Sequence, residues 1–237
     1  MIFCIDSGNT RIKWGIHDGR SWVAQGACAQ GKAAELSELV VAWPIPRRVM
    51  VANVAGAHAL AAIVQALGAW RERVTVVRPA AAAGGVENGY RRPETLGADR
   101  WCALVGARQV LGRACVVVGA GTATTVDSLD SGGKFLGGLI LPGLDLMRDS
   151  LARGTAGLPR AEGRYLPTPD NTNDALVSGA IEATAGAIER ASRRLDGAPC
   201  LLFGGAAGAI RNALEIVFQE EPLLVLTGLH RLADDTR

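Results

Sequence analysis

The chain has 237 residues, of which 49% are hydrophobic, enough for one large or two small domains with packed cores. Lysine and arginine total 25 against 23 aspartate and glutamate, which argues against the broad basic surface of a nucleic-acid-binding or membrane-surface protein. No apolar run reaches the roughly 18 residues of a membrane span, and no basic segment precedes an apolar start. We therefore expect a soluble cytoplasmic protein. Its five cysteines, without C-x-x-C spacing, indicate reduced thiols rather than a zinc site.

The first half of the chain predicts a sheet covered by helices. Apolar runs at residues 2–5 and 12–16 indicate two strands, and Asp18-Gly19 indicates a hairpin turn before a third strand at 22–27. The apolar spacing then predicts, in order, a helix around 36–40, a strand at 48–53, a helix at 57–67 and a strand at 74–77. Such alternation of strands and helices is typical of α/β domains.

A loop and a long helix complete the first half. Residues 79–93 are rich in alanine, glycine and proline, so we expect a surface loop of the kind that carries functional groups. A helix at 97–111 follows, and a domain boundary is expected near residue 115. The sequence therefore predicts two domains, at residues 1–115 and 116–237.

The second half repeats the order of strands and helices. We expect, in order, hairpin strands between 114 and 141, a helix at 144–151, a polar connection at 154–173, a helix at 174–195, a strand at 200–203, a Gly204-Gly205 turn that opens a helix to 217, a strand at 223–226 and a closing helix. The polar connection is expected to be mobile or to face a partner. The Gly204-Gly205 turn could place adenine or ribose against bare backbone, although such joints also form for close packing alone.

A polar turn, Asp6-Ser7-Gly8-Asn9-Thr10, directly follows the first strand. Phosphate binding needs backbone N–H groups close to the oxygens, which Gly8 permits, and short side chains that donate hydrogen bonds. Asp6 could hold Mg²⁺ directly or through water, and Lys13 could add positive charge toward the phosphates. A hairpin whose polar groups satisfy only its own backbone is the alternative, and this motif alone does not decide between the two.

A similar strand and turn recur at residues 116–127, and this repeat favours a nucleotide site. Gly121 and Thr122 take the places of Gly8 and Asn9, so a duplicated domain that closes around a nucleotide explains both copies. The position that matches the first carboxylate is Gly119. The second copy therefore lacks an acidic group that internal symmetry predicts.

The segment from Asn88 to Trp101 gathers charged and aromatic residues where a helix begins. Asp99 in the first helical turn could simply stabilise the helix dipole, whereas Arg100 there gains nothing from that dipole. The functional interpretation is that the carboxylate accepts a proton from an attacking hydroxyl. The neighbouring guanidinium could then bind a substrate carboxylate with two hydrogen bonds.

With these residues assembled, the chain resembles the type III pantothenate kinases, members of the acetate and sugar kinase, heat-shock cognate and actin superfamily. Four motifs in order carry the resemblance over essentially the whole chain: Asp6-x-Gly-Asn-Thr10, Tyr90-x-x-Pro-x-x-Leu-Gly-x-Asp-Arg100, Gly121-Thr-Ala-x-Thr-x-Asp127 and Gly137-Gly-x-Ile-x-Pro-Gly143. It implies an α/β protein of two similar ribonuclease H-like domains, the duplicated actin-like ATPase fold, with a nucleotide cleft. It also implies ATP-dependent phosphorylation of pantothenate, the first step of coenzyme A biosynthesis, by a homodimer.

The resemblance further implies a role for each matching residue. Asp99 would accept the proton of the attacking hydroxyl, and Asp6 would hold Mg²⁺. The ATP contacts that it implies are Asp6, Ser7, Gly8, Asn9, Thr10, Arg11, Ile12, Lys13 and Thr122. The pantothenate contacts that it implies are Tyr90, Gly97, Ala98, Asp99, Arg100 and Thr184.

One position departs from the family pattern. Members usually carry aspartate at the position of Gly119, where it binds a monovalent cation such as K⁺ or NH₄⁺, so a K⁺ requirement is in doubt for this chain. Asp127 or a neighbouring carbonyl could substitute, or Asp127 could be an exposed hairpin residue. His17, His58 and His230 are scattered along the sequence and are expected to be surface or locally bonded residues.

Two alternatives to a pantothenate kinase remain open. The first is a non-catalytic, nucleotide-binding regulator that resembles the Bvg accessory factor. The second is a sugar or small-acid kinase on the same scaffold, because a fold does not fix a substrate. The segment from Tyr90 to Arg100 matches the pantothenate enzymes and has no reason to recur in sugar kinases.

Overall fold

The computed structural model describes residues 1–158, 160 and 162–235, and these form two compact units. Unit 1 comprises Met1–Gly112 together with the C-terminal segment that begins at Leu223, and unit 2 comprises Arg113–Pro222. The C-terminal segment thus groups with unit 1, whereas the sequence assigned it to a domain at residues 116–237. The described strands form two sheets, each with both parallel and antiparallel pairs, and helices pack on them as predicted.

The sheet of unit 1 has five strands in the order β3-β2-β1-β4-β5. The central strand β1 pairs antiparallel with β2 and parallel with β4. The strands are β1 at Ile2–Ser7, β2 at Arg11–His17, β3 at Trp22–Ala29, β4 at Arg48–Asn53 and β5 at Val74–Val76. The hairpin turn predicted at Asp18-Gly19 is present, with the Asp18 carboxylate accepting hydrogen bonds from the backbone N–H groups of Arg20 and Ser21.

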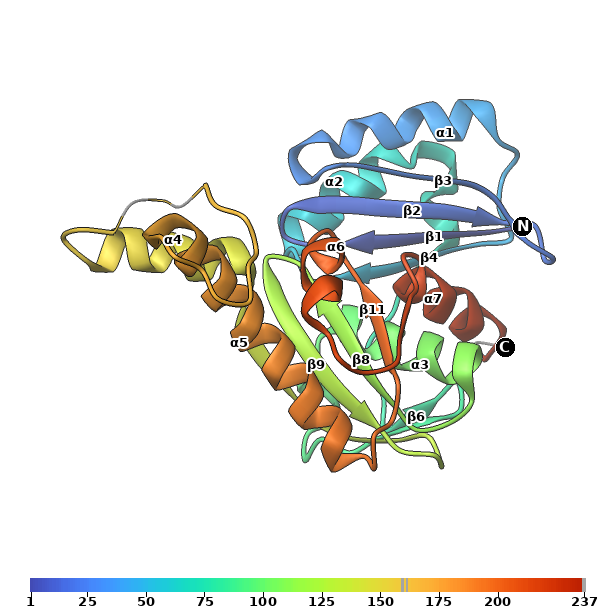
Figure 1. Ribbon diagram of the computed structural model, residues 1–237. Coiled ribbons are helices and arrows are strands. Elements are labelled where there is room, and N and C mark those ends of the chain that lie inside the picture. The colour runs from blue at the N-terminus through green and yellow to red at the C-terminus, as the bar shows by residue number, and fades with distance from the viewer. Residues whose placement is uncertain (159, 161, 236–237) are drawn as a thin grey trace. The chain divides into compact units, whose positions relative to one another are not determined.

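Helices cover both faces of this sheet (Figure 1). They are η1 at Gln30–Glu35, α1 at Leu36–Ala42, α2 at Ala57–Ala66, η2 at Gly68–Arg73, η3 at Pro93–Thr95, α3 at Ala98–Leu111 and α7 at Leu224–Asp235. Phe3 and Ile5 of β1 pack with Trp70 in the core beneath α1 and α2. Because alternate residues of a strand face opposite sides, Cys4 and Asp6 face α3 and α7.

A short hairpin lies within the segment that the sequence predicted to be a loop. Strands β6 at Ala82–Ala83 and β7 at Val86–Asn88 pair antiparallel. Gly84 and Gly85 between them have φ of +60° and +80°, so this two-residue turn uses the left-handed conformation that glycine adopts freely. Strands of two and three residues are too short for an alternating pattern to appear in the sequence.

Unit 2 repeats the arrangement of unit 1. Its strands follow the order β12-β11-β8-β9-β10, and β8 pairs antiparallel with β9 and parallel with β11, as β1 does with β2 and β4. These strands are β8 at Cys115–Ala120, β9 at Ala123–Leu129, β10 at Lys134–Pro142, β11 at Cys200–Phe203 and β12 at Phe218–Glu220. The helices are α4 at Leu144–Gly154, α5 at Thr172–Arg194, α6 at Ala207–Ile210 and η4 at Arg211–Ala213. The long helix α5 packs Ile181 and Ile188 against Val116 and Val118 of β8.

The last part of the chain departs from the sequence prediction. The helix expected to run to residue 217 ends early, as α6 and η4, and strand β12 follows at Phe218–Glu220. The run expected as a strand at 223–226 is the start of α7, in which Leu224, Leu229 and Leu232 are buried. A short apolar run fits either element, and tertiary packing decides between them. Of the polar connection predicted at 154–173, residues 159 and 161 lie outside the described residues.

Within the described part of the chain, no helix is both long and apolar enough to cross a membrane. All five cysteines are buried free thiols, as their spacing predicted.

Candidate active site

The first polar turn joins β1 and β2, and its side chains point to different places. Its base is closed by a hydrogen bond from the Gly8 N–H to the Arg11 carbonyl, at 3.1 Å. Asn9 and Thr10 are exposed at the surface of the turn. Ser7 and Ile12 are completely buried on the side of α1 and α2, so their side chains do not reach the surface of the turn.

Asp6 at the end of β1 is directly opposite Lys13 in the register of β1 and β2. Burial raises the pKa of the Asp6 carboxyl to about 6, Lys13 lowers it, and the carboxylate of Asp99 raises it further. The structure therefore brings together Asp6 and Asp99, which are far apart in the sequence. A partly desolvated carboxylate beside another carboxylate is electrostatically suited to a cation.

The first turn of α3 holds Asp99 in a defined position. Gly97 has an extended backbone and caps the helix, and the Trp101 N–H donates to its carbonyl at 2.9 Å. The Asp99 side chain bends back, so that its Oδ1 accepts the Arg100 backbone N–H at 2.8 Å. A side chain at residue 97 would place its Cβ 2.6 Å from this Oδ1. Glycine at 97 is therefore required by the position of the carboxylate.

Arg100 is buried, with an exposed fraction of 6%, and reaches back to the segment before the helix. Its Nη1 donates to the hydroxyl of Tyr90 at 3.0 Å, and its guanidinium carbon lies 5.6 Å from the centre of the Tyr90 ring. Asn88, which the sequence placed in this segment without a role, organises it. The Asn88 side chain donates to the carbonyls of Ala80 and Pro93 and accepts the N–H of Tyr90.

The second polar turn, between β8 and β9, is closed by a hydrogen bond from the Gly121 N–H to the Ala123 carbonyl, at 3.1 Å. Thr122 in this turn is exposed. Gly143 supports the turn from behind: its N–H donates to the Thr122 carbonyl at 3.0 Å, and a Cβ on Gly143 would lie 2.5 Å from that same oxygen. The Pro142-Gly143 pair at the end of the fourth sequence motif thus supports the second turn directly.

A side chain at Gly119 would require the ring of Phe203 to move. A Cβ there would lie 2.8 Å from Cζ of Phe203, which is its neighbour in the register of β8 and β11, and 3.0 Å from the hydroxyl of Thr125. An aromatic ring and a hydroxyl thus fill the place of the carboxylate that the repeat predicts. Asp127, considered as a substitute or as an exposed hairpin residue, is in fact buried, with an exposed fraction of 1%.

Thr184 on α5 is completely buried, and its hydroxyl donates to the Ala180 carbonyl at 2.9 Å. Its contact with a substrate stays a prediction. The Gly204-Gly205 turn has a packing reason, because Gly204 has φ of +105° and a side chain there would collide with the Ala120 carbonyl.

The described residues include no group of three or more histidine, cysteine, aspartate or glutamate side chains that could hold a metal ion by themselves. Any metal at Asp6 would therefore need oxygen ligands from a substrate or from water.

Two mixed sheets, each with an antiparallel strand pair closed by a polar turn, define the actin-like ATPase fold. A solved structure from Campylobacter jejuni, described as a Baf family transcriptional activator, superposes with a TM-score of 0.68 at 19% identity over 98% of both chains. Another from Sinorhizobium meliloti, described as a 2-dehydro-3-deoxygalactonokinase, gives a TM-score of 0.66 at 15% identity over 99% of both chains. At these identities the likeness shows the fold alone.

Sequence similarity then specifies the family. A sequence model of the type III pantothenate kinases matches residues 2–194. Type III pantothenate kinases of Dechloromonas aromatica and Aromatoleum aromaticum are 54% and 53% identical to this chain. The alignments cover 98% and 97% of this chain and 99% and 96% of the two relatives. The chain belongs to the type III pantothenate kinase family.

Proposed function

We propose that this chain transfers the γ-phosphoryl group of ATP to the primary hydroxyl of pantothenate, forming 4'-phosphopantothenate in the first step of coenzyme A biosynthesis. The observation that carries the proposal is the electrostatic interaction of Asp99 with the buried carboxyl of Asp6, which adds to the effect of burial in raising the pKa of Asp6. A carboxylate that can accept a proton thus lies beside one that can attract a cation. Family membership identifies the substrates.

The substrate side of the reaction is assigned to the segment before α3 and to its first turn. Asp99 accepts the hydroxyl proton as the phosphoryl group transfers, and its carboxylate is already oriented by the Arg100 N–H. The guanidinium of Arg100 binds the pantothenate carboxylate, and its hydrogen bond to the Tyr90 hydroxyl fixes its orientation. Gly97, Ala98 and Thr184 are further proposed contacts of pantothenate.

The nucleotide side is assigned to the two polar turns. Asn9, Thr10 and Thr122 are exposed, and their side chains can donate hydrogen bonds to phosphate oxygens. Phosphoryl transfer depends mainly on positioning and on charge stabilisation. Mg²⁺ would neutralise charge on the phosphates, and Asp6 fits it, because Mg²⁺ commonly takes one or two carboxylates together with phosphates and water.

A monovalent cation does not fit the residues at the second turn. The ring of Phe203 occupies the space beside Gly119, and this residue offers no side-chain oxygen. We therefore assign no K⁺ or NH₄⁺ to this chain.

The active form is proposed to be a homodimer. Unit 2 exposes several large apolar side chains on two consecutive elements, β10 and α4. Its members are Leu136, Leu139, Ile140, Leu146 and Leu151, with exposed fractions from 39% to 65%. Exposed apolar side chains of this size are candidates for burial in a protein interface.

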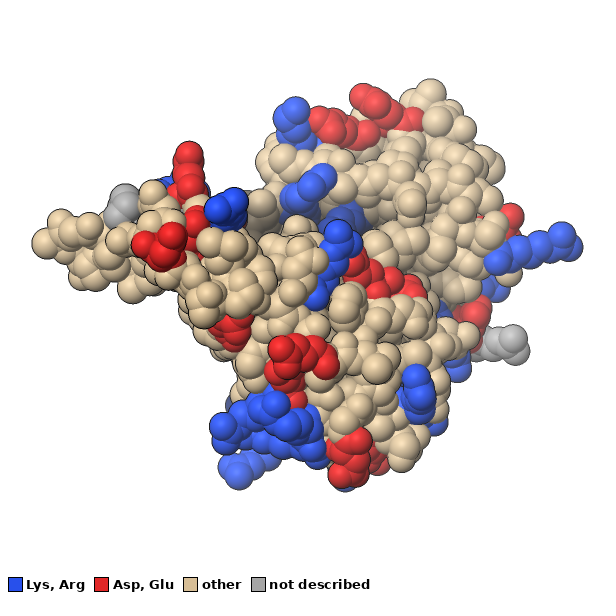
Figure 2. All heavy atoms as spheres, viewed as in Figure 1, with Lys and Arg blue, Asp and Glu red and all other residues tan. Residues whose placement is uncertain are grey.

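The alternative, a non-catalytic regulator, is less well supported. On the face shown in Figure 2, basic side chains stand in separate groups with acidic side chains nearby, without the continuous basic stripe of a nucleic-acid-binding protein. The carboxylates and the guanidinium that the kinase reaction needs are all present. We therefore favour a cytoplasmic, ATP-using enzyme over the regulator.

A coupled assay of ADP release tests the proposal with purified protein, ATP and Mg²⁺. Release that depends on pantothenate, together with a phosphorylated product detected by mass spectrometry, is the expected result. Nucleotide binding without turnover would favour the regulator. Turnover with a sugar but not with pantothenate would favour the other kinase.

A further inference from the structure

The C-terminal helix α7 packs against α3, the helix whose first turn carries Asp99 and Arg100. Every residue of α3 from Arg100 to Ala107 is buried, so α3 is surrounded by the protein. The buried residues of α7 are Leu224, Val225, Leu226, Gly228, Leu229, Leu232 and Ala233. The sequence model of the family ends at residue 194, so α7 lies beyond the residues that it matches.

Two glycines bring the backbones of α3 and α7 into contact. A Cβ on Gly106 of α3 would lie 3.2 Å from the backbone nitrogen of Gly228 and would collide with the Leu224 carbonyl. A Cβ on Gly228 of α7 would lie 2.6 Å from the carbonyl carbon of Cys102 and would collide with its oxygen. Because the colliding atoms belong to the backbone, no rotation of a side chain can relieve either clash. A methyl group at this crossing must move a helix.

The atoms that Gly228 approaches are close to the proposed active site. Cys102 is three residues after Asp99, about one helical turn along α3. Burial raises the pKa of the Cys102 thiol, and the carboxylates of Asp6 and Asp99 raise it further. Because Cys102 and Asp99 lie one turn apart on the same helix, displacement of the Cys102 backbone would move the first turn of α3 relative to β1.

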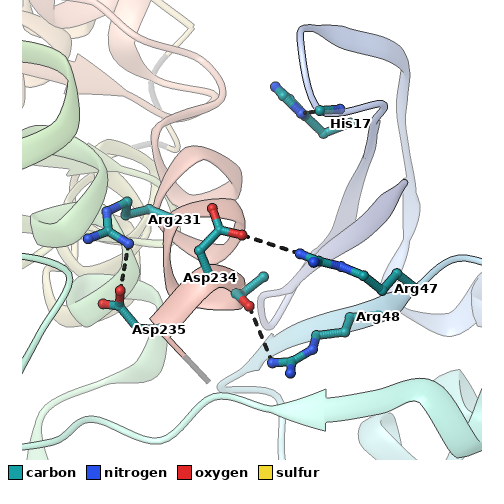
Figure 3. A network of polar contacts seen from close by, with 8 residues as sticks. His17, Arg47, Arg48, Arg231, Asp234 and Asp235 are labelled. Carbon is teal, nitrogen blue, oxygen red and sulfur yellow. Dashed lines mark hydrogen bonds and ion pairs between the residues drawn. The ribbon is translucent and has the colours of Figure 1, made fainter. Parts of the chain in front are cut away.

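The far end of α7 is attached to the sheet (Figure 3). Arg47 forms an ion pair with Asp234 at 3.2 Å, and Nη1 of Arg48 donates to the Ala233 carbonyl at 3.2 Å. Arg48 is the first residue of β4 and pairs with Ile2 of β1. Helix α7 therefore connects α3 to the two central strands of unit 1.

We propose that Gly106 and Gly228 are positioning residues for phosphoryl transfer. By allowing the two backbones to touch, they determine how closely α3 packs against α7. This packing in turn determines the position of Asp99 relative to Asp6. This inference rests on the proposed function, because it takes the roles of the two carboxylates from it. A misplacement of about 1 Å can reduce turnover by roughly 100-fold.

The test compares Gly228→Ala with Gly179→Ala, a matched change in the helix α5, where a Cβ would meet no atom within 4 Å. Initial rates are measured with ATP and pantothenate varied separately, at a temperature where circular dichroism shows full folding. For Gly228→Ala we expect kcat/KM for pantothenate to fall about 10-fold to 100-fold, with the KM for ATP changing less than about twofold. Gly179→Ala should keep the wild-type constants.

The variant Ile63→Ala distinguishes a loss of stability from a displacement of Asp99. Ile63 belongs to α2 and is completely buried in the core on the opposite face of the sheet. This variant should lower the melting temperature without changing the kinetic constants. An equal kinetic loss in Ile63→Ala, or wild-type kinetics in Gly228→Ala, would overturn the inference. A wild-type protein that does not phosphorylate pantothenate would instead overturn the proposed function.

Gly106→Ala is the second test variant, to be used if Gly228→Ala does not fold. Its methyl group presses on the Leu224 carbonyl in the first turn of α7, where the helix end has more freedom to move. The same pattern, a loss confined to pantothenate turnover, is expected. Wild-type constants for this variant would contradict the positioning role.

Discussion

The ring of Phe203 lies against Gly119, in the space that a side chain at residue 119 would need. In the other copy of the repeat, the equivalent position carries Asp6. One copy of the repeat thus carries a carboxylate at this position, whereas the other carries a glycine packed against an aromatic ring. This difference allows a requirement for a monovalent cation to be tested.

Turnover should be independent of K⁺ and NH₄⁺. Initial rates in sodium, potassium and ammonium salts at equal ionic strength are expected to agree within about twofold, since no side-chain oxygen at residue 119 distinguishes these ions. Gly119→Asp should not create K⁺ dependence. It should lower the stability by about 1–3 kcal/mol, because the new side chain collides with the Phe203 ring. Activation of the wild type by K⁺ of tenfold or more would show that another group holds the ion.

Asp6→Asn should stabilise the nucleotide-free protein and abolish its activity. The folded pKa of Asp6 is raised to about 6, so the folded state favours the protonated carboxyl, and stability is lost as the pH rises from about 4 through 6. At pH 8 the free energy of unfolding of the variant should exceed that of the wild type by about 1–3 kcal/mol. The difference between the two proteins should vanish near pH 4. Calorimetry at both pH values measures this. A variant that is less stable at pH 8 would contradict the electrostatic account of the site.

Asp99→Asn should retain ATP binding and lose most turnover. The amide keeps the size of the side chain and can still accept the Arg100 N–H, but it cannot take up the proton of the hydroxyl. A decrease in kcat of about 10²–10⁴-fold is expected for the loss of a general base. Equilibrium titration with a fluorescent ATP analogue provides the control. Full turnover by this variant would exclude the proposed proton acceptor.

Tyr90→Phe should affect pantothenate more than ATP. The change removes the hydroxyl that accepts the hydrogen bond from Arg100 Nη1 but keeps the ring beside the guanidinium. A hydrogen bond with a charged donor contributes about 1.5–3 kcal/mol, so kcat/KM for pantothenate should fall roughly 10-fold to 100-fold. The KM for ATP should stay within about twofold of the wild-type value. If both substrates are affected equally, Arg100 does not act on pantothenate alone.

The pair of His17 and His230 should make the protein less stable in mild acid. Their rings stack with centroids 3.8 Å apart, and burial lowers the pKa of each below its usual value, with His17 lowering that of His230 further. The N-terminal amino group also lowers both pKa values, whereas Asp234 raises them. Because the folded state favours neutral imidazoles, stability present above pH 6.5 should be lost as the pH falls below it.

Denaturant titrations of the wild type and of His230→Gln between pH 5 and pH 8 measure this effect. The variant should lose less stability than the wild type over the acidic half of this range. Parallel pH profiles for the two proteins would show that the stacked pair does not titrate in this way.

The motifs of the sequence predicted the two sheets, the repeated turns and the segment around Asp99, because each depends on residues that are neighbours in the chain. Glycine and short polar residues after an apolar strand specify a turn locally. The helix at 97–111 was expected from its spacing, and the structure begins it at Ala98. Family membership confirms the resemblance on which the residue roles were based.

Contacts between distant residues could not be predicted in this way. The stacking of His17 with His230 and the contact of Phe203 with Gly119 both depend on how strands and helices come together in space. Helix α7 was partly missed because its first residues, from Leu224, form a short apolar run, and Gly228 lowers the intrinsic helix propensity of the segment. Only the partner helix α3 explains why a glycine is required there.

The return of α7 to unit 1 has a consequence for the order in which the protein is made. Residues 113–222 leave the ribosome before α7 does, so unit 2 has its complete sequence while unit 1 still lacks one of the helices that cover its sheet. Domains generally fold as units during synthesis, with the N-terminal one first. In this chain that order is reversed at the last step: the N-terminal unit, with its proposed catalytic residues, can close only after the unit that follows it has been synthesised.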